Sequence, residues 1–224
     1  MQILLISATT FEIKKIIDDL HFDVINDSFY SKKIGDNSVD ILISGIGIAF
    51  TVYSLTKALN RKKYDFVLNV GIVGAFADWL KIGDVVQVTS EEFGDLGIRS
   101  KNSFSSLFDT GFIKPNEFPF TDGKLINKNN AVLLLFDTES VVGLTVNSVN
   151  GNKNEIEEIK RKFKADIESM EGAAVFYVCL MENVAFVQIR SVSNYVEERN
   201  KANWDIPLAI DNLTKYCKDL LNKI

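Results

Sequence analysis

Hydrophobic positions along the chain alternate between short continuous runs and longer stretches with helical periodicity. The short runs have the length of strands and predict strands over residues 2–7, 39–43, 66–70, 84–89, 141–146 and 184–191. The periodic stretches predict helices over 11–20, 49–59, 154–163 and 172–181, with residues 166–170 leading into the last of these. A closing helix places one apolar stripe along Ile206, Ile210, Leu213, Cys217, Leu220 and Ile224.

The predicted strands are apolar on both faces and alternate with helices. This pattern is typical of an α/β fold whose sheet is covered on both sides. We therefore expect a single three-layer αβα domain over residues 1–224, with a central, twisted, mixed and largely parallel sheet. No internal repeat, linker or low-complexity tract suggests a second domain.

Two charged or irregular regions complete the prediction of elements. Residues 93–128 are rich in Gly, Asn, Ser, Asp and Phe and have weak periodicity, which predicts loop and short helix. A loop of this length in a compact domain is usually functional or interfacial. In the helix predicted over 154–163, Glu157 with Arg161 and Glu158 with Lys162 have i,i+4 spacing, which is typical of a solvent face.

Composition narrows the classes of function. The 224 residues carry a net charge of −5, so no basic surface for nucleic acid or an anionic membrane is expected. The N-terminal apolar run is too short for a signal sequence or a membrane span. Cys179 and Cys217 lie in helical patterns, which favours reduced thiols and a cytoplasmic protein. A single histidine, His21, makes a Ser-His-Asp triad or a multi-histidine metal site improbable and is expected on the surface.

Ligands of such sheets collect at the carboxyl ends of the strands, where two glycine-rich segments occur. The first resembles a dinucleotide-binding turn at Gly45 and Gly47, but Phe50 replaces the third glycine and Asn69 stands where an acidic residue is needed. A nicotinamide cofactor is therefore not expected. The second segment, residues 69–75, is predicted as a turn that either approaches a ligand or simply joins a strand to a helix.

Three polar side chains follow predicted strands and could carry chemistry. Glu171 stands at a helix N-terminus, where the dipole alone stabilises a carboxylate, yet its apolar neighbours also suggest a ligand such as a ribose diol. Asn194 offers a donor and an acceptor, which match N7 and the six-position of a purine. Glu12 lies in a first helical turn, where a solvated carboxylate is the simple alternative.

Six segments in this order and spacing resemble the nucleoside phosphorylase/nucleosidase superfamily, over nearly the whole chain. They are Glu12, 45–47, 69–74, 82–86, 169–174 and 190–194. Within that superfamily the chain looks most similar to the futalosine hydrolases and to the methylthioadenosine/S-adenosylhomocysteine nucleosidases. Residues 92–97, 193–200 and 204–207 look like the futalosine hydrolase version. The resemblance implies a nucleoside phosphorylase-like fold.

The resemblance also implies a reaction. Residues 7–12 lack the Gly and Arg of a phosphate loop, which favours hydrolysis over phosphorolysis. Asn194 stands where the adenine-specific nucleosidases have an aspartate, and a donating amide suits the two acceptors of a 6-oxopurine. We therefore expect hydrolysis of the N-ribosidic bond of futalosine to hypoxanthine and dehypoxanthine futalosine, a step of menaquinone biosynthesis. The alternatives are an adenine-releasing nucleosidase, a phosphorylase, or a non-catalytic nucleoside-binding module.

By the same resemblance, Glu12 would activate water, Glu171 would bind the ribose hydroxyls and Asn194 would hold the leaving base. Arg190 would orient the Glu12 or Asn194 loop or form a structural ion pair. Further substrate-binding residues would be Gly71, Ile72, Val73, Met170 and Ser193, although Ile72 and Val73 replace small polar residues of the adenine-specific relatives. No cofactor or metal is implied, and a homo-oligomer is expected.

The tail of the substrate would need an aromatic and cation-bearing cleft. Four phenylalanines of the irregular middle region could supply its aromatic part, namely Phe104, Phe108, Phe118 and Phe120. Alternatively, these side chains pack the loop itself or a partner subunit.

Overall fold

The structure is a computed structural model that describes residues 1–101, 103–128, 138–149, 151–198 and 200–223. In this part of the chain, one ten-stranded sheet runs in the order β11-β10-β6-β12-β5-β1-β4-β3-β2, and β9 pairs with β6. Its long central strands are β1 (Gln2–Ser7), β4 (Asn37–Ile43), β5 (Phe66–Ala75), β6 (Val85–Phe93), β10 (Ser140–Thr145) and β12 (Ala185–Tyr195). Strands β4, β1, β5 and β12 are parallel, whereas β6 is antiparallel to β12. The predicted mixed α/β fold is confirmed.

The sheet closes on itself at one end. Strand β11 (Ile167–Ser169) pairs in parallel with β10 and also antiparallel with β5, where Glu168 faces Gly74. Strands β5, β12, β6, β10 and β11 therefore form a closed ring of hydrogen-bonded neighbours. The other end of the sheet stays open and finishes in the hairpin of β2 (Asp23–Asn26) and β3 (Phe29–Ile34).

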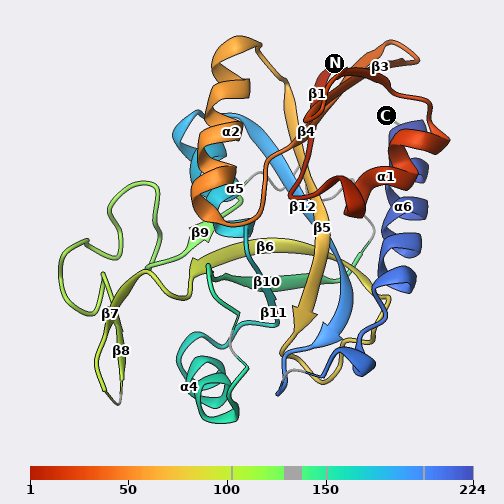
Figure 1. Cartoon of the computed structure of the whole chain (residues 1–224). Helices are drawn as coiled ribbons and strands as arrows, with labels where there is room; N and C mark the ends of the chain where they lie inside the picture. Colours follow the sequence, from red (N-terminus) through yellow and green to blue (C-terminus); the bar gives the residue numbers. More distant parts are fainter. Residues whose placement is uncertain (102, 129–137, 150, 199, 224) are drawn as a thin grey trace.

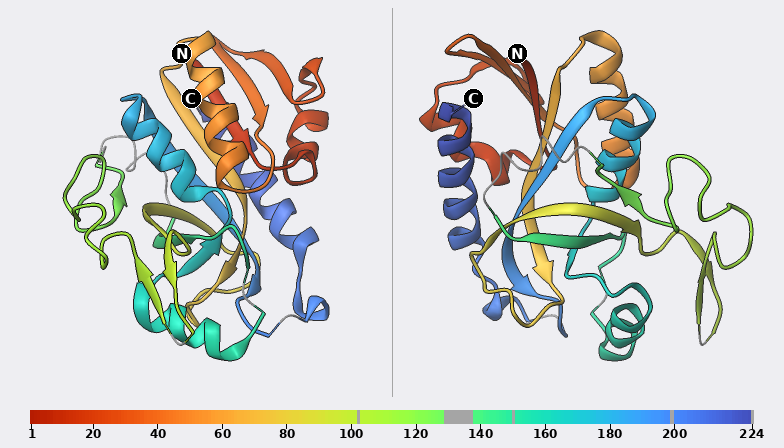
Figure 2. Two further views of the ribbon diagram at one scale, coloured as in Figure 1. Left: turned by 60° about the vertical axis from the view of Figure 1, so that its left-hand side comes forward. Right: turned by 180° about the vertical axis from the view of Figure 1, so that it is seen from behind.

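Helices cover both faces of the sheet (Figures 1 and 2). Helices α1 (Thr10–Asp19) and α6 (Ile206–Lys223) pack on one face, and α2 (Ile48–Arg61) and α5 (Gly172–Met181) pack on the other. The alternation of β1 explains this arrangement, because Ile3 and Leu5 join the core under α1 and α6, while Leu4 and Ile6 join the core under α2 and α5. None of the described helices is long and apolar enough to cross a membrane.

The C-terminal helix uses its apolar stripe as predicted. Ile210, Leu213, Cys217 and Leu220 are buried in α6. Ile206 is only half-buried, and Ile224 lies outside the described residues. His21 is exposed after α1, as expected.

Residues 71–74 do not form the predicted turn. Strand β5 continues to Ala75, and no helix follows it directly. The physical reason is pairing on two sides, because β12 accompanies β5 from Phe66 to Ala75 and β11 pairs with its end. Strand β12 likewise continues to Tyr195, so that Asn194 lies within a strand rather than after one.

The middle of the chain contains strands in place of the predicted short helix. Strands β7 (Gly97–Arg99) and β8 (Phe104–Ser106) form a separate two-stranded sheet, and β9 (Leu125–Ile126) pairs with β6. Residues 93–101 and 103–128 include no helix. These strands are too short for a periodicity of two to be visible in the sequence.

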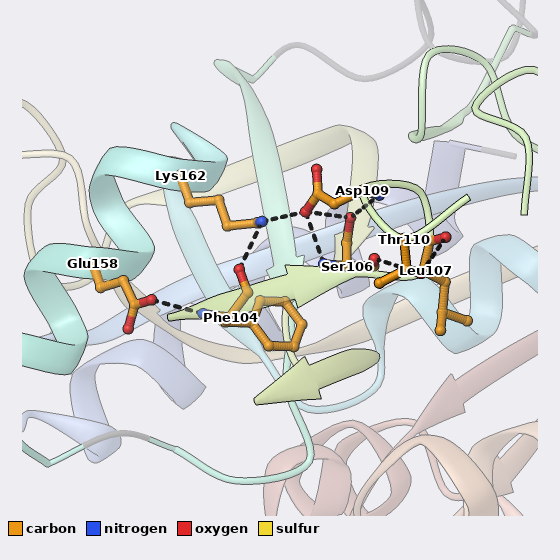
Figure 3. Close-up of polar contacts among 7 residues, drawn as sticks. All are labelled: Phe104, Ser106, Leu107, Asp109, Thr110, Glu158 and Lys162. Atoms are coloured by element: carbon orange, nitrogen blue, oxygen red, sulfur yellow. Dashed lines mark hydrogen bonds and ion pairs between the residues drawn. The ribbon is translucent and has the colours of Figure 1, made fainter. Parts of the chain in front are cut away.

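Helix α4 (Lys153–Phe163) holds the β7–β8 sheet with the charged residues that were assigned to a solvent face (Figure 3). Glu158 accepts a hydrogen bond from the backbone N–H of Phe104 at 3.0 Å, and the Lys162 ammonium donates to the Phe104 carbonyl oxygen at 3.0 Å. Lys162 also pairs with Asp109, whose pKa it lowers to about 2. The solvent-face prediction is therefore wrong for Glu158, which the β7–β8 sheet partly covers. Lys162 is exposed as predicted, although its ammonium contacts the same sheet.

We predict that Glu158→Ala destabilises the protein by about 1–2 kcal/mol, because it leaves the half-buried Phe104 N–H without its acceptor. For a chain of this size, thermal unfolding should shift downwards by about 2–8 °C, measured by differential scanning calorimetry. Glu157→Ala on the exposed side of α4 is the matched control and should leave the melting temperature nearly unchanged. Equal shifts for the two variants would contradict the role given to Glu158.

Candidate functional site

A cavity of about 390 Å³ opens where β1, β5, β11 and β12 end. Strands β5 and β12 run side by side to this end of the sheet (Figure 1). The polar wall of the cavity contains Glu12, Glu168, Ser169, Glu171 and Asn194. Its apolar wall includes Phe11, Ile46, Ile72, Val73, Val149, Met170, Tyr195, Val196, Trp204 and Ile206. A few polar groups in a mostly apolar concavity are typical of a small-molecule site.

Glu12 is buried at the floor of this cavity. Its carboxylate accepts hydrogen bonds from the Thr9 backbone N–H at 3.1 Å, the Thr9 hydroxyl at 2.9 Å and the Ser7 hydroxyl at 3.3 Å. The Glu12 backbone N–H in turn donates a hydrogen bond to the Thr9 hydroxyl oxygen. Together these bonds form a capping box at the start of α1. The other carboxylate oxygen accepts from the Ile72 N–H of β5 at 3.1 Å. Glu12 is therefore fixed in place and is not a solvated helix-end carboxylate.

Glu171 approaches the same cavity from the N-terminus of α5. Its carboxylate accepts a hydrogen bond from the Gly47 N–H at 2.9 Å. Gly47 has a φ of 95°, which glycine adopts readily, so the glycine turn presents its N–H to this side chain. Burial raises the pKa of Glu171, and the charge of Arg190 and the Gly47 N–H oppose this rise.

Asn194 is held by its neighbours in β12. Its amide oxygen accepts from the Ser193 hydroxyl at 2.8 Å, and its amide nitrogen donates to the Tyr195 carbonyl oxygen at 2.9 Å. The nitrogen carries two hydrogens, so one remains for a molecule in the cavity. Ser193 also lies 3.0 Å from the Val73 carbonyl oxygen and is buried behind Asn194.

Gly71 and Arg190 do not reach the cavity surface. Arg190 is 1% exposed, and a Cβ on Gly71 would lie 2.2 Å from its guanidinium and 2.8 Å from the Glu12 carboxylate. Gly71 is therefore required by close packing, because the strand must pass these two side chains. Within the described residues, Arg190 makes no carboxylate contact within 4 Å, and its Nε and one terminal nitrogen have no partner.

A buried polar chain lies inside the ring of strands. Glu91 accepts from the Gln188 amide at 2.6 Å and from the Thr145 hydroxyl at 2.9 Å, and Thr145 in turn accepts from the Ala173 N–H at 2.7 Å. Full burial raises the pKa of Glu91 to about 7, although these donors and Arg190 oppose the rise. These hydrogen bonds connect the N-terminus of α5, which carries Glu171, to the sheet.

Glu168 was not among the predicted site residues, and the four phenylalanines of the middle region do not line the cavity. Glu168 is a carboxylate in a strand of three residues, two positions before Met170, and this isolated charge was the available signal. Phe104 packs against Phe163 of α4, and Phe108 packs against Phe120, which contacts Tyr177 of α5. Phe118 is exposed. Packing of the loop therefore explains three of the four phenylalanines, and Phe11 and Trp204 line the cavity instead.

The remaining sequence features concern Arg199, metal-binding side chains and the two cysteines. Arg199, in the segment 193–200, lies outside the described residues. Among the described residues, no group of three or more His, Cys, Asp or Glu side chains is arranged to hold a metal ion. Cys179 and Cys217 are free and buried.

The sequence and the fold match one class of proteins. Residues 2–223 match the model of the phosphorylase superfamily, and the chain belongs to that superfamily. Within it, the chain is 30% identical over 179 residues to the futalosine hydrolase of Acidothermus cellulolyticus, a match that covers 79% of this chain and 72% of that protein.

Solved structures show the same fold. The native structure of futalosine hydrolase from Helicobacter pylori strain 26695 superposes with a TM-score of 0.84 and 19% identity, covering 100% of this chain and 98% of that chain. The methylthioadenosine/S-adenosylhomocysteine nucleosidase of Colwellia psychrerythraea in complex with adenine gives a TM-score of 0.82 and 19% identity, covering 100% and 95%. The family model confirms the predicted superfamily, and these structures share its fold.

We predict that Gly172→Ala strongly destabilises the protein, because the added Cβ would lie 1.9 Å from the Glu91 carboxylate. Chemical denaturation should show a loss of at least about 2 kcal/mol. Glu91→Asp shortens the obstructing side chain, so the double variant should lose less than the sum of the two single losses. Additive losses would show that this contact does not explain the glycine.

Proposed function

We propose that this chain hydrolyses the N-ribosidic bond of futalosine and releases hypoxanthine and dehypoxanthine futalosine, a step of menaquinone biosynthesis. The observation that carries the proposal is one cavity wall with two fixed carboxylates, Glu12 and Glu171, and the amide of Asn194. The similarity to a futalosine hydrolase over most of the chain supports the same reaction.

In the proposed reaction the C1′–N9 bond loosens first, and the ribose gains positive charge as in glycoside hydrolysis. Glu171 accepts hydrogen bonds from the ribose hydroxyls, and its charge stabilises the developing cation. Glu12 takes a proton from the water that attacks C1′. Its hydrogen bonds to Thr9 and Ile72 keep the carboxylate in one position, which general base catalysis requires.

Asn194 recognises the leaving base in this proposal. A 6-oxopurine presents two neighbouring acceptors, O6 and N7, and the free amide hydrogen of Asn194 can be donated to them. The Ser193 hydroxyl and the Tyr195 carbonyl oxygen fix the orientation of the amide. Ile72, Val73 and Met170 supply the apolar surface around the nucleoside. Gly71 lies behind it and leaves room for the Arg190 guanidinium and the Glu12 carboxylate.

We further propose a homo-oligomeric, cytoplasmic enzyme with one nucleosidase domain over residues 1–224. Several large apolar side chains are exposed, namely Phe11 and Ile46 of the cavity lining and Phe50 and Tyr53 of α2, and such surfaces suit a partner subunit. The two free cysteines agree with a reducing compartment.

The second candidate is an adenine-releasing nucleosidase, which the structural likeness to such enzymes makes worth testing. We predict that the wild type releases hypoxanthine from futalosine more efficiently than adenine from methylthioadenosine. Asn194→Asp should lower the ratio of the two kcat/KM values about 5- to 150-fold, because a carboxylate cannot donate to O6 and a buried mismatch costs about 1–3 kcal/mol. Chromatography of the released bases measures both rates.

Asn60→Asp, an exposed amide on α2, is the matched control and should leave the ratio unchanged. A wild type that prefers methylthioadenosine would refute the futalosine assignment. Turnover that depends on added phosphate would instead indicate a phosphorylase.

We predict that Glu12→Gln lowers kcat about 10²- to 10⁴-fold and leaves binding of the nucleoside nearly intact, because the amide cannot take a proton from water. Turnover is followed by release of base, and binding is measured by isothermal calorimetry with the variant. A wild type that binds nucleoside without turnover would support a non-catalytic binding module.

A further inference from the structure

A third carboxyl side chain of the cavity, Glu168, stands in line with the base-recognising amide. Glu168 in β11 pairs with Gly74 in β5, and Gly74 pairs with Asn194 in β12. Directly paired residues on neighbouring strands point to the same face of a sheet. Glu168 and Asn194 therefore flank a position with no side chain, and both line the cavity. A base held by Asn194 would lie within the reach of Glu168.

The surroundings of Glu168 differ from those of Glu12 and Glu171. Glu12 accepts four hydrogen bonds and Glu171 accepts one from Gly47. Glu168 is 7% exposed, and one of its carboxyl oxygens has no hydrogen-bond partner. An ionised carboxylate in such a place is costly, whereas a protonated one carries a hydrogen that it can give to a ligand.

The charges around Glu168 act in the same direction. Burial raises its pKa to about 7, and the negative charge of Asp95, in the connection after β6, contributes to the rise. Its partner in β10 is Leu144, and its partner in β5 is Gly74, so neither strand supplies a charge. The other charged side chains among the described residues of the cavity lining are the carboxylates of Glu12, Glu171 and Glu197, so no cation among them lowers the pKa of Glu168.

We propose that Glu168 is the general acid that protonates the departing purine. This inference rests on the proposed nucleosidase function and deepens it. When the C1′–N9 bond breaks, its electron pair stays on the base, and the Glu168 hydroxyl proton passes to a ring nitrogen of the base. Water adds to C1′ and gives one proton to Glu12. After the products leave, Glu168 regains a proton from solvent and Glu12 releases one, so that the cycle balances.

Glu168 supplies the proton transfer to the base that the Asn194 amide cannot perform. An amide can donate a hydrogen bond to the base, but it does not release a proton readily. A carboxyl group with a pKa near the working pH is suited to proton transfer. Because Glu168 must be protonated to act, the rate falls as the pH rises above about 7.

The test is the pH profile of hypoxanthine release from futalosine by the wild type, Glu168→Gln, Glu168→Asp and Asp95→Asn. Glu168→Gln should lower kcat about 10²- to 10⁴-fold with a much smaller change in KM. Its remaining activity should lack the fall above pH 7, and Glu168→Asp should retain more activity because it keeps a carboxyl group. Glu157→Gln, on the exposed face of α4, is the control and should match the wild type.

Asp95→Asn gives a second readout that leaves Glu168 in place. Removing the negative charge lowers the pKa of Glu168, so the fall in rate should move to lower pH. A Glu168→Gln variant with kcat within about 3-fold of the wild type, or with an unchanged alkaline fall, would overturn the proposal. So would an Asp95→Asn profile that does not move, should Glu168→Gln fail to fold.

Failure of the proposed function is recognised separately. A wild type that releases no hypoxanthine from futalosine refutes the substrate, whatever Glu168 does. The same variants are then measured on methylthioadenosine, because protonation of a departing purine is needed for adenine as well. Loss of the alkaline fall on that substrate would support Glu168 as the acid, and its persistence would overturn it.

Discussion

The structure depends on one buried cation, Arg190, inside the ring of strands. Among the described residues it is the only buried Lys or Arg, and its charge opposes the rise that burial causes in the pKa of both Glu91 and Glu171. Burying several carboxylates near one another without such a charge would be costly. Its guanidinium also fills the space beside Gly71, so the backbone of β5 can pass only where a side chain is absent. The position of the cavity floor follows from this packing.

Closure of the ring places the rest of the site. Because β11 pairs with the end of β5, the strand that carries Glu168 lies across β5 from the strand that carries Asn194. The same closure brings the N-terminus of α5, and with it Glu171, towards the Gly47 turn. Three buried carboxyl groups with different surroundings thus line one cavity, which is how a protein obtains acid and base functions from one residue type.

The hydrogen-bond donors distinguish these carboxyl groups. Glu12 is surrounded by donors from the start of α1 and from β5, while Glu168 meets apolar and acidic neighbours. The proposed reaction uses this contrast, with a proton accepted at one position and donated at another. Asn194 is the group that orients the base in this proposal. Hydrogen bonds to Ser193 and Tyr195 fix its own orientation.

The sequence by itself determined the α/β class, most of the strands and helices, and the superfamily, because buried runs and glycine spacing are local patterns. It also predicted Glu12, Glu171 and Asn194 as site residues, each near a strand end or a helix start, and the three line one cavity. Tertiary structure alone decided that residues 71–74 are strand, because that depends on pairing with β11 and β12. It alone placed Glu168 across Gly74 from Asn194, and it brought the β7–β8 sheet onto Glu158. Contacts between distant segments leave no periodicity in a single sequence, and these residues are defined by such contacts.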